Sequence, residues 1–555
     1  MTTTGARVLA EMLDGYGVTH LFHVPAVLRR TMVEIEAHTS IKRLRPHGEK
    51  PAAYMADGYA RASGRPGICA AQVVGAHNLA AGLRDAHLAH SPVIALTGGR
   101  DPHTKFRKVY QEVDDVPAFE TVTKMNATID AVERIPDMVR QAFRVATTGA
   151  PGPVHLQFRG NEGQIDADEA DMDVYCEEQF AAVPPFRPAP PDNDLIRALG
   201  VLDGAERPVI VAGGGVRASG SGPALVALAE KLGVPVATSL NGKDVIPGTH
   251  PLSVGVVGTY SRGSANRVVL EADLVFFVGT ETGGMTTHFW KVPPLGTRVI
   301  HLDIDPEALG RNYPPEVAIN GDARTALTRM LELAGERAGH REWADAAAGH
   351  VADWRLEYSP LLESDQVPIR PERLCAELTD LVPDDGIVVV DTGHAGMWMG
   401  GMYDLRAPTQ SYLRSAGHLG WAFPASLGAK CAQPDRPVVC FTGDSGFWYH
   451  VAEIETAVRW GINSITVVNN NHSGNQSKRG FDRVYGGKQT EKALEMWVFT
   501  EVDFAGLAEH IGAVGIRVEK PADLAPAFDR ALATDRPVIL DVVTDIDALA
   551  PPAVE

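Results

Sequence analysis

The sequence predicts an α/β protein built from three doubly wound parallel-sheet domains. Its 555 residues are enough for about three to four domains of ordinary size. Helical and strand patterns alternate along most of the chain, which indicates parallel sheets with helices on both faces. Two segments, at about 166–192 and 335–369, interrupt this alternation. We therefore expect three domains, at 1–165, 193–335 and 370–548.

Hydrophobic periodicity places the elements of the first part in order. An amphipathic helix opens the chain, and apolar runs bounded by turn residues follow it. The segment at 166–192 turns acidic and then proline-rich, which is typical of a stiff connector. The predicted elements are helices at 6–16 and 50–62 and strands at 20–24, 68–73 and 93–97.

The other two parts repeat the alternation. Polar residues at 335–369 predict a second connecting segment between them. In the third part, a helix beginning near Phe447 should separate two strands. The predicted strands are 208–212, 235–238, 274–278 and 298–302 in the second part, and 437–441 and 464–468 in the third.

Composition excludes several function classes. Hydrophobic residues make up 45% of the chain, which is ample for packed cores, and the net charge is −19. This charge argues against nucleic acid or an anionic membrane as a partner, since both require a basic surface. The five cysteines are scattered without metal-ligand spacing, so we expect neither disulfides nor structural zinc, and a cytoplasmic location. We see no signal-peptide pattern and no apolar run of membrane-spanning length.

The most informative motif is Gly443-Asp444-Ser445-Gly446, which directly follows the strand at 437–441. One helix and one strand later comes the triplet Asn469-Asn470-Asn471. Such a unit returns both sets of side chains to one edge of a parallel sheet, where oxygen ligands suit Mg²⁺ carrying a diphosphate. Glycines let the backbone approach phosphate oxygens closely. The N-terminus of a helix binds the same oxygens through its free N–H groups and the positive end of its dipole. An Asx-rich loop without a ligand is the alternative for this motif alone.

The motif resembles the fingerprint of thiamine-diphosphate (ThDP) enzymes of the acetolactate synthase, pyruvate oxidase and benzaldehyde lyase superfamily. Ser445 departs from the family's Gly-Asp-Gly. The three-part order also matches the family, which implies a pyrimidine-binding, a central and a diphosphate-binding domain. The resemblance implies Mg²⁺ ligation by the Asp444 and Asn471 side chains and the Ser473 carbonyl, with Asn470 as the alternative to Asn471. Residues 473–487 are expected to form a polar loop that closes over the site.

Glu49 stands where the family has a glutamate before a helix that ends in Gly58-Tyr59-Ala60-Arg61. A partly desolvated carboxyl group can share a proton with a ring nitrogen of the cofactor and so prepare it for reaction. The alternative for an isolated glutamate is a surface acid stabilised by the helix dipole.

The segment Gly75-Ala76-His77-Asn78 is similar to a family loop that lines the reaction pocket. Asn78 is expected to contact the cofactor, and His77 either faces the substrate as a proton donor or caps the helix. His23 lies where relatives have glycine, and Ala26 and Val27, which replace two further family glycines, should narrow the pocket. Gln111 matches a glutamine that contacts substrate or intermediate in several family members.

In the third part, Asp391-Thr392-Gly393-His394 resembles a turn that cradles the cofactor. Leu419 stands where the family has a bulky apolar wedge that holds the cofactor bent, although it would otherwise pass for a core leucine. His418 and His394 could both act on substrate. The resemblance therefore implies cofactor contacts from Thr392, Gly393, His394, Leu419 and residues 443–446.

The second part contains Gly213-Gly214-Gly215 after a strand, which approximates a dinucleotide turn. No acid ends the next strand, so an NAD-dependent dehydrogenase is not expected. The segment Gly279–Gly284 lacks the run found in FAD-containing relatives, so FAD is not expected either. The resemblance leaves an adenine nucleotide, coenzyme A (CoA) or no ligand in this domain.

Together these features predict a ThDP- and Mg²⁺-dependent lyase or carboligase that acts on a 2-oxo acid or 2-hydroxy carbonyl compound. A 2-hydroxyacyl-CoA lyase or oxalyl-CoA decarboxylase is the first alternative. A dinucleotide-binding oxidoreductase and a non-catalytic binding subunit are the distant ones. The family implies a homodimer or homotetramer in which Glu49 of one subunit meets cofactor held by Asp444 of its neighbour.

Overall fold

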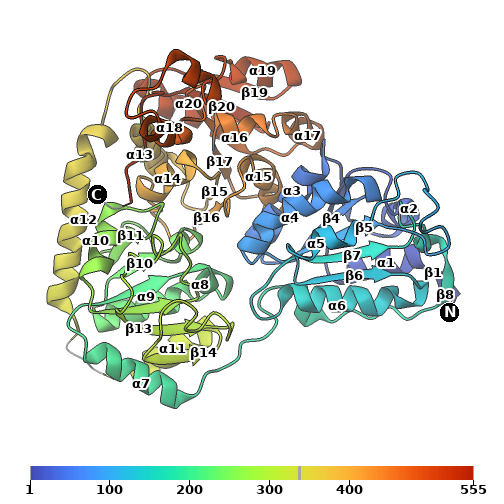
Figure 1. Cartoon of the computed structure of the whole chain (residues 1–555), viewed down its shortest axis with the longest axis horizontal. Helices are drawn as coiled ribbons and strands as arrows, with labels where there is room; N and C mark the ends of the chain where they lie inside the picture. The colour runs from blue at the N-terminus through green and yellow to red at the C-terminus, as the bar shows by residue number, and fades with distance from the viewer. Residues whose placement is uncertain (1, 336–338, 554–555) are drawn as a thin grey trace.

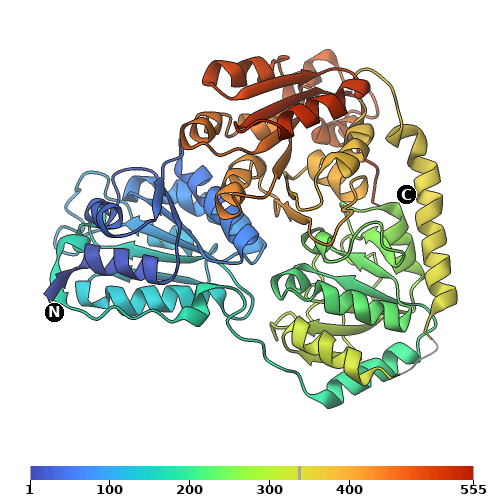
Figure 2. The ribbon, with the colours of Figure 1, turned by 180° about the vertical axis from the view of Figure 1, so that it is seen from behind.

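The computed structural model describes residues 2–335 and 339–553. Within these residues the strands form three six-stranded sheets and one two-stranded ribbon. Neighbouring strands of each six-stranded sheet are parallel, and helices pack around each sheet (Figures 1 and 2). The predicted fold class is confirmed.

The first sheet has the strand order β3-β2-β4-β5-β7-β6. The ribbon pairs β1 (Thr2–Thr4) with β8 (Glu169–Asp171), so the start of the predicted connector folds back onto this domain. The other elements are β2 (His20–His23), β3 (Lys42–Leu44), β4 (Gly67–Ala71), β5 (Val93–Gly98), β6 (Met125–Ile129), β7 (Val154–Phe158), α1 (Gly5–Gly15), α2 (Arg29–His38), α3 (Glu49–Ser63), α4 (Ala76–Leu88), α5 (Val116–Phe119) and α6 (Ile135–Thr147).

The central sheet has the order β11-β10-β9-β12-β13-β14. Its middle strands read as continuous apolar runs because helices bury both of their faces. The elements are β9 (Pro208–Ala212), β10 (Val236–Thr238), β11 (Ser253–Val256), β12 (Leu274–Val278), β13 (Arg298–Asp303), β14 (Val317–Asn320), α7 (Asp192–Asp203), α8 (Gly214–Ala218), α9 (Gly222–Leu232), α10 (Gly263–Glu271) and α11 (Ala323–Leu333).

The third sheet has the order β16-β15-β17-β18-β20-β19. The elements are β15 (Ile387–Val390), β16 (Ser411–Arg414), β17 (Val438–Gly443), β18 (Ile465–Asn470), β19 (Val514–Val518), β20 (Val538–Val543), α13 (Pro371–Leu381), α14 (His394–Gly401), α15 (Ala422–Ala432), α16 (Asp444–Trp448), α17 (Glu453–Trp460), α18 (Lys478–Val484), α19 (Phe504–Ile511) and α20 (Leu524–Leu532). The domain boundaries proposed from the sequence enclose the three sheets.

Three local expectations were wrong. The polar segment at 335–369 contains a 22-residue helix, α12 (Arg341–Leu362), which runs along one side of the molecule in Figure 1. Its buried residues are only Trp343, Ala347 and Trp354, a helical spacing too sparse to stand out in the sequence. The predicted loop at 473–487 contains α18. The helix expected near Phe447 begins at Asp444 and ends at Trp448, and α17 follows it.

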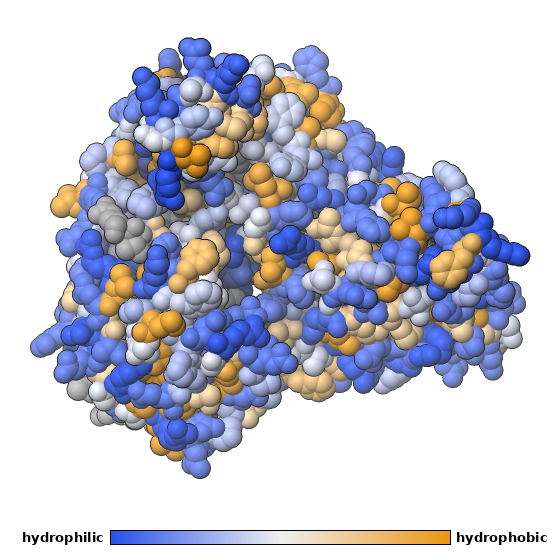
Figure 3. All heavy atoms as spheres, in the orientation of Figure 1, coloured by the Kyte–Doolittle hydropathy of each residue, from blue (hydrophilic) through white to orange (hydrophobic). Residues whose placement is uncertain are grey.

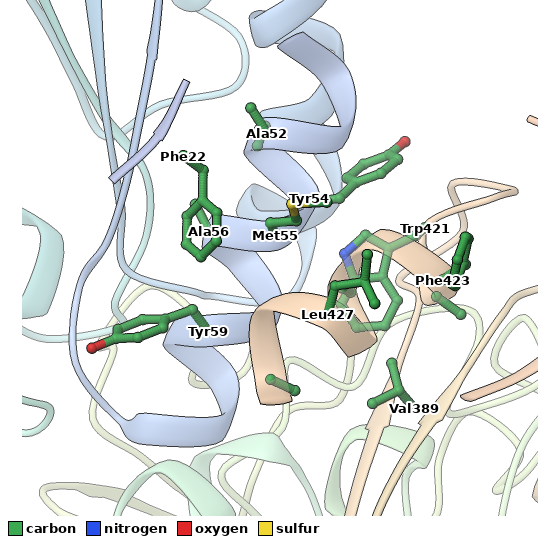
Figure 4. Close-up of a cluster of buried hydrophobic side chains, with 14 of the residues drawn as sticks. Phe22, Ala52, Tyr54, Met55, Ala56, Tyr59, Val389, Trp421, Phe423 and Leu427 are labelled. Carbon is green, nitrogen blue, oxygen red and sulfur yellow. The ribbon is translucent and has the colours of Figure 1, made fainter. Parts of the chain in front are cut away.

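The N-terminal and C-terminal domains meet where α3 crosses α15 (Figure 4). Two glycines allow the helices to approach closely. A Cβ on Gly58 would lie 2.0 Å from the Ala425 carbonyl oxygen, and a Cβ on Gly428 would lie 1.9 Å from that of Met55. A polar contact spans the same crossing, because Trp421 Nε1 donates to Asp57 Oδ2 at 2.8 Å.

We expect Gly428→Ala to weaken this interface. The added methyl group meets backbone rather than a movable side chain, so overpacking should cost roughly 1–3 kcal/mol or more. Thermal unfolding should show a lower midpoint, and limited proteolysis should cleave between the domains sooner. Gly349→Ala, on exposed α12 with no heavy atom within 4 Å of the new methyl, is the matched control. A wild-type midpoint for Gly428→Ala would contradict the close crossing.

The visible surface is largely hydrophilic. Hydrophilic residues cover most of the face in Figure 3, with apolar residues scattered among them. In the described part of the chain, no helix combines the length and apolar character needed to cross a membrane.

Candidate active site

Two neighbouring strands of the third sheet end in polar residues. Strands β17 and β18 are parallel, with Gly443 opposite Asn469. Asp444 and Asn471 therefore both lie just beyond the carboxyl edge of the sheet. Asp444 is 2% exposed, and its Oδ2 accepts the Ser473 backbone N–H at 3.0 Å. Ser473 Oγ donates to Asn471 Oδ1 at 2.9 Å, so the three predicted metal ligands are brought together.

The chemistry of this cluster fits a hard divalent cation. Burial raises the pKa of Asp444 to about 7, and the nearby carboxylate Asp541 acts in the same direction. A bound cation would offset the cost of that buried charge. Within residues 2–335 and 339–553, no three His, Cys, Asp or Glu side chains gather as a metal site. One carboxylate with amide and carbonyl oxygens is a donor set that suits Mg²⁺.

Asn470 is committed to other contacts. Its Nδ2 donates to Asp541 Oδ1 at 2.8 Å and to the Val502 carbonyl at 3.0 Å. Its Oδ1 accepts the His472 N–H at 3.3 Å, so both ends of the Asn470 amide have protein partners.

The turn around Asp444 leaves space for a ligand. A Cβ on Gly443 would meet no heavy atom within 4 Å, whereas one on Gly446 would lie 2.8 Å from Asp391 Oδ2. The Ser445 N–H donates to Asp444 Oδ1 at 2.6 Å. Ser445 lies inside α16, so the departure from Gly-Asp-Gly places serine in ordinary helical backbone.

A second turn, after β15, faces the first. Asp391 accepts hydrogen bonds from the backbone N–H groups of Thr392 at 2.8 Å and Gly420 at 3.1 Å. Gly393 has a φ of +71°, which glycine adopts without strain. His394 Nδ1 lies 2.7 Å from Asn475 Oδ1, and burial lowers the pKa of His394 to about 4.

Asp391 makes the stability of the protein pH-dependent. Burial raises its pKa to about 7, so the folded state binds a proton that the unfolded state releases near pH 4. This contribution to stability is present below about pH 4 and is lost as the pH rises toward 7. We expect the thermal midpoint of Asp391→Asn, relative to wild type, to rise between pH 5 and pH 8. A constant difference across that range would contradict the assignment.

Glu49 is the first residue of α3 and is partly buried. Its Oε2 accepts from Asn78 Nδ2 at 3.2 Å. A Cβ on Gly75 would lie 2.4 Å from Glu49 Oε1, so only glycine leaves the space that the carboxyl group occupies. These contacts hold Glu49 within the N-terminal domain, beside the loop predicted to line the pocket.

His77 and Gln111 lie against the same loop. His77 Nδ1 is 2.6 Å from Asp115 Oδ1. The N-cap residue of α4 is Gly75, and no side-chain hydrogen bond caps this helix. Gln72 Nε2 donates to Gln111 Oε1 at 2.7 Å. Two contacts therefore join the segment at 72–78 to the segment at 99–115.

The other two predicted residues lie elsewhere. His418, beside the partly exposed Leu419, has its Nδ1 2.6 Å from the hydroxyl oxygen of Tyr54 on α3. His23 lines a separate hollow between β3 and the C-terminal domain, with Lys42, Arg43 and Trp460. Burial lowers the pKa of His23 to about 4. The structure does not join His23 to the Glu49 loop.

Sequence reasoning missed Asp115, Tyr54 and Asn475 as the partners of the candidate histidines. Asp115 lies shortly after Gln111 in the chain, but nothing in the local pattern pairs it with a residue on α4. Tyr54 reads as a core residue of an amphipathic helix. Only the folded arrangement shows these contacts.

A cavity of about 380 Å³ lies at the carboxyl ends of the middle strands of the central domain, where this domain borders the other two. Gly214, Gly215, Glu281, Asp303 and Arg414 line it. The acid that the sequence lacks at the end of β10 is present at the end of β13, as Asp303. Burial raises the pKa of Asp303 to about 6.

Comparison with known proteins identifies the family. Models of thiamine pyrophosphate enzymes match the chain in three parts: the N-terminal TPP binding domain at residues 3–118, the central domain at 195–330 and the C-terminal TPP binding domain at 391–542. A probable acetolactate synthase large subunit of Methanocaldococcus jannaschii is 31% identical over 98% of this chain and 92% of that protein. The chain belongs to the thiamine pyrophosphate enzyme family. Thiamine pyrophosphate is thiamine diphosphate, so the predicted family and the predicted ThDP cofactor are confirmed.

Other relatives of this thiamine pyrophosphate enzyme cover similar lengths. The glyoxylate carboligase of Escherichia coli O157:H7 is 31% identical over 96% of this chain and 92% of that protein. The acetolactate synthase large subunit of Lactococcus lactis is 28% identical over 98% of this chain and 92% of that protein. The chain is therefore a ThDP-dependent enzyme, as predicted.

Proposed function

We propose that this enzyme uses ThDP and Mg²⁺ to break or form a carbon–carbon bond next to a carbonyl group. The substrate class is a 2-oxo acid or a 2-hydroxy carbonyl compound. The observation that carries the proposal is the meeting of Asp444, Asn471 and Ser473 at the carboxyl edge of the third sheet. Relatives named acetolactate synthase and glyoxylate carboligase support a carboligase.

The residues at that edge would hold the cofactor's diphosphate. Asp444, Asn471 and the Ser473 carbonyl would bind Mg²⁺, while Leu419 would support the rings. Bound ThDP supplies a thiazolium ring that accepts the electron pair of the bond being broken. Glu49, held by Asn78, would exchange a proton with the pyrimidine ring. We also propose that the cofactor contacts the backbone of Thr392, Gly393, His394, Gly443, Ser445 and Gly446.

The substrate end would be formed by side chains near the Glu49 loop. His77 and Gln111 are fixed there by Asp115 and Gln72. His418 would approach from the C-terminal domain. His23 would act on the pocket only indirectly, because the hollow that His23 lines is separate from the Glu49 loop.

A substrate panel tests the proposal. Purified protein with ThDP and Mg²⁺ is incubated with 2-oxo acids, aldehydes, 2-hydroxy ketones and 2-hydroxyacyl-CoA thioesters, and the products are identified. Turnover of a 2-oxo acid or 2-hydroxy carbonyl compound that requires both cofactors is expected. Full occupancy by ThDP with no turnover of any panel member would contradict the proposed function.

A 2-hydroxyacyl-CoA lyase or oxalyl-CoA decarboxylase remains the second candidate, because of the central cavity. Asp303 and Arg414 both line this cavity, where Asp303 would accept hydrogen bonds from ribose hydroxyl groups and Arg414 would supply a positive charge. Saturable binding of CoA, with turnover of a CoA thioester in the panel, would favour this candidate. Binding of ADP alone would leave the first candidate in place.

We further propose a homodimer or homotetramer with active sites between subunits. Helices α3 and α15 pack together within one chain, but the hydrogen bonds of Glu49 and Asp444 stay within their own domains, so we propose that a neighbouring subunit completes each site. Mixing Glu49→Gln subunits with Asp444→Asn subunits should restore part of the activity, because one site per mixed dimer is intact. No restoration after verified subunit exchange would place both groups in one chain.

The five unpaired cysteines support the cytoplasmic location inferred from the sequence.

A further inference from the structure

A carboxylate is paired with the most exposed of the candidate histidines. Asp115 Oδ1 lies 2.6 Å from His77 Nδ1. The His77 side chain is 56% exposed, whereas Asp115 is 1% exposed. One edge of the imidazole ring is therefore anchored to a buried group, while more than half of the side chain stays exposed.

We propose that Asp115 positions His77 as the group that exchanges a proton with the substrate, by holding Nδ1–H and leaving the Nε2 lone pair free. This inference rests on the proposed carbon–carbon lyase or carboligase function. Asp115 is the positioning residue, and His77 is the one that would touch the substrate.

The surroundings of Asp115 support this role. Its Oδ2 is buried without a hydrogen-bond partner, so the carboxyl group gains little from any contact other than His77. Burial raises the pKa of Asp115 to about 6, with His77 the largest opposing influence. The neighbouring charges are Asp114 and Arg100, which pair with each other at 2.6 Å. Above pH 7 the buried carboxylate therefore faces the imidazole.

The pair lies beside the proposed cofactor contacts. Asn78, the next residue after His77, donates to Glu49. Asp115 belongs to the same segment as Gln111, which Gln72 holds against the loop. His77 and Asp115 therefore come from the two segments that the sequence independently assigned to the reaction pocket.

The other candidate histidines differ from His77 in the partners of their ring nitrogens. His418 faces the Tyr54 hydroxyl, His394 faces the Asn475 side chain, and His23 Nδ1 is unpartnered. Among these four histidines, all of them described by the structure, His77 alone is paired with a carboxylate. A carboxylate at Nδ1 fixes the tautomer and stabilises the imidazolium that forms when Nε2 takes a proton.

The proton transfer balances in both directions. In cleavage, Nε2 takes the proton of a substrate hydroxyl group, and the O–H electron pair becomes the second bond of a new carbonyl group. The electron pair of the breaking carbon–carbon bond stays with the other carbon. In ligation, the imidazolium returns the proton to the carbonyl oxygen as the new carbon–carbon bond forms.

The tautomer of His77 tests the proposal without any turnover. Protein labelled with ¹⁵N-histidine is measured at pH 8, and the His77 signals are assigned by their loss in His77→Gln. Wild type should show a protonated Nδ1 and an unprotonated Nε2. Asp115→Asn should shift the ring toward the Nε2–H tautomer, because the amide can donate to Nδ1. An Nε2–H tautomer in wild type would overturn the proposal.

Kinetics then separate positioning from a structural role. His77→Gln and Asp115→Asn should each lower kcat by roughly 10²- to 10⁴-fold with little change in KM. In the His77→Gln background, Asp115→Asn should cause no further loss, because the two residues act as one unit. Additive losses would show that Asp115 acts independently of His77. Asp114→Asn, on the neighbouring exposed carboxylate, is the matched control and should keep wild-type kcat.

The outcomes distinguish this inference from the proposed function. Deuterium exchange at C2 of bound ThDP should be unchanged in Asp115→Asn, because Glu49 is assigned to that step. An active enzyme with the wrong His77 tautomer would overturn the inference alone. A correct tautomer in a protein that turns over no panel member would instead count against the proposed function.

Discussion

Replacing Glu49 with glutamine is expected to slow C2 deuterium exchange of bound ThDP by roughly 10²- to 10⁴-fold, the range that positioned proton transfer contributes. Glutamine keeps the shape of the side chain, and its amide oxygen can still accept from Asn78. The change therefore removes the carboxyl group that exchanges a proton with the cofactor, while the hydrogen bond from Asn78 stays in place. Exchange is followed by NMR after rapid mixing with D₂O and acid quenching.

The matched control for this variant is Glu133→Gln, on the exposed surface of the same domain. It should exchange at the wild-type rate. ThDP affinity should stay close to wild type in both variants, because the diphosphate end is untouched. Undiminished exchange in Glu49→Gln would remove Glu49 from cofactor activation.

Replacing Asp444 with asparagine should weaken Mg²⁺-dependent ThDP binding by about 100-fold or more, since even changes to groups that only support a metal ligand cost roughly 10- to 100-fold. The folded protein without cofactor should be as stable as wild type or more so. Asparagine can still accept the Ser473 N–H, and the cost of burying a carboxylate disappears. Calorimetric titration and thermal unfolding measure the two effects.

Asp435→Asn, on an exposed residue of the same domain, is the control for Asp444→Asn and should bind ThDP normally. Chelation of Mg²⁺ from wild type should reproduce the loss seen in Asp444→Asn. If Asp444→Asn binds ThDP and Mg²⁺ as tightly as wild type, the metal site lies elsewhere.

The sequence predicted those parts of the fold that depend on local pattern. Buried strands such as β12 are continuous apolar runs, and the apolar runs of β17 and β18 each give way to glycine and polar residues at the carboxyl end of the strand. The parallel-sheet rule then places Asp444 beside Asn471. By contrast, helix α12 was not predicted, because it buries only a few widely spaced side chains where it packs against two domains.

Contacts between distant segments could not be predicted in this way. The Gly58–Gly428 crossing depends on backbone approach, which leaves no periodic signal in either helix. The His77–Asp115 pair joins a helix to a loop, and only the packing of both segments against the first sheet decides that they meet. Asp303 shows the same limit, because the acid expected after β10 lies instead on β13, across two intervening strands.

The most direct test of the central claim is calorimetric titration of the purified protein with ThDP at saturating Mg²⁺. We predict saturable binding of one ThDP per chain that disappears when the divalent cation is chelated. Absence of binding with Mg²⁺ in excess, or equal binding with and without a divalent cation, would contradict the site built around Asp444.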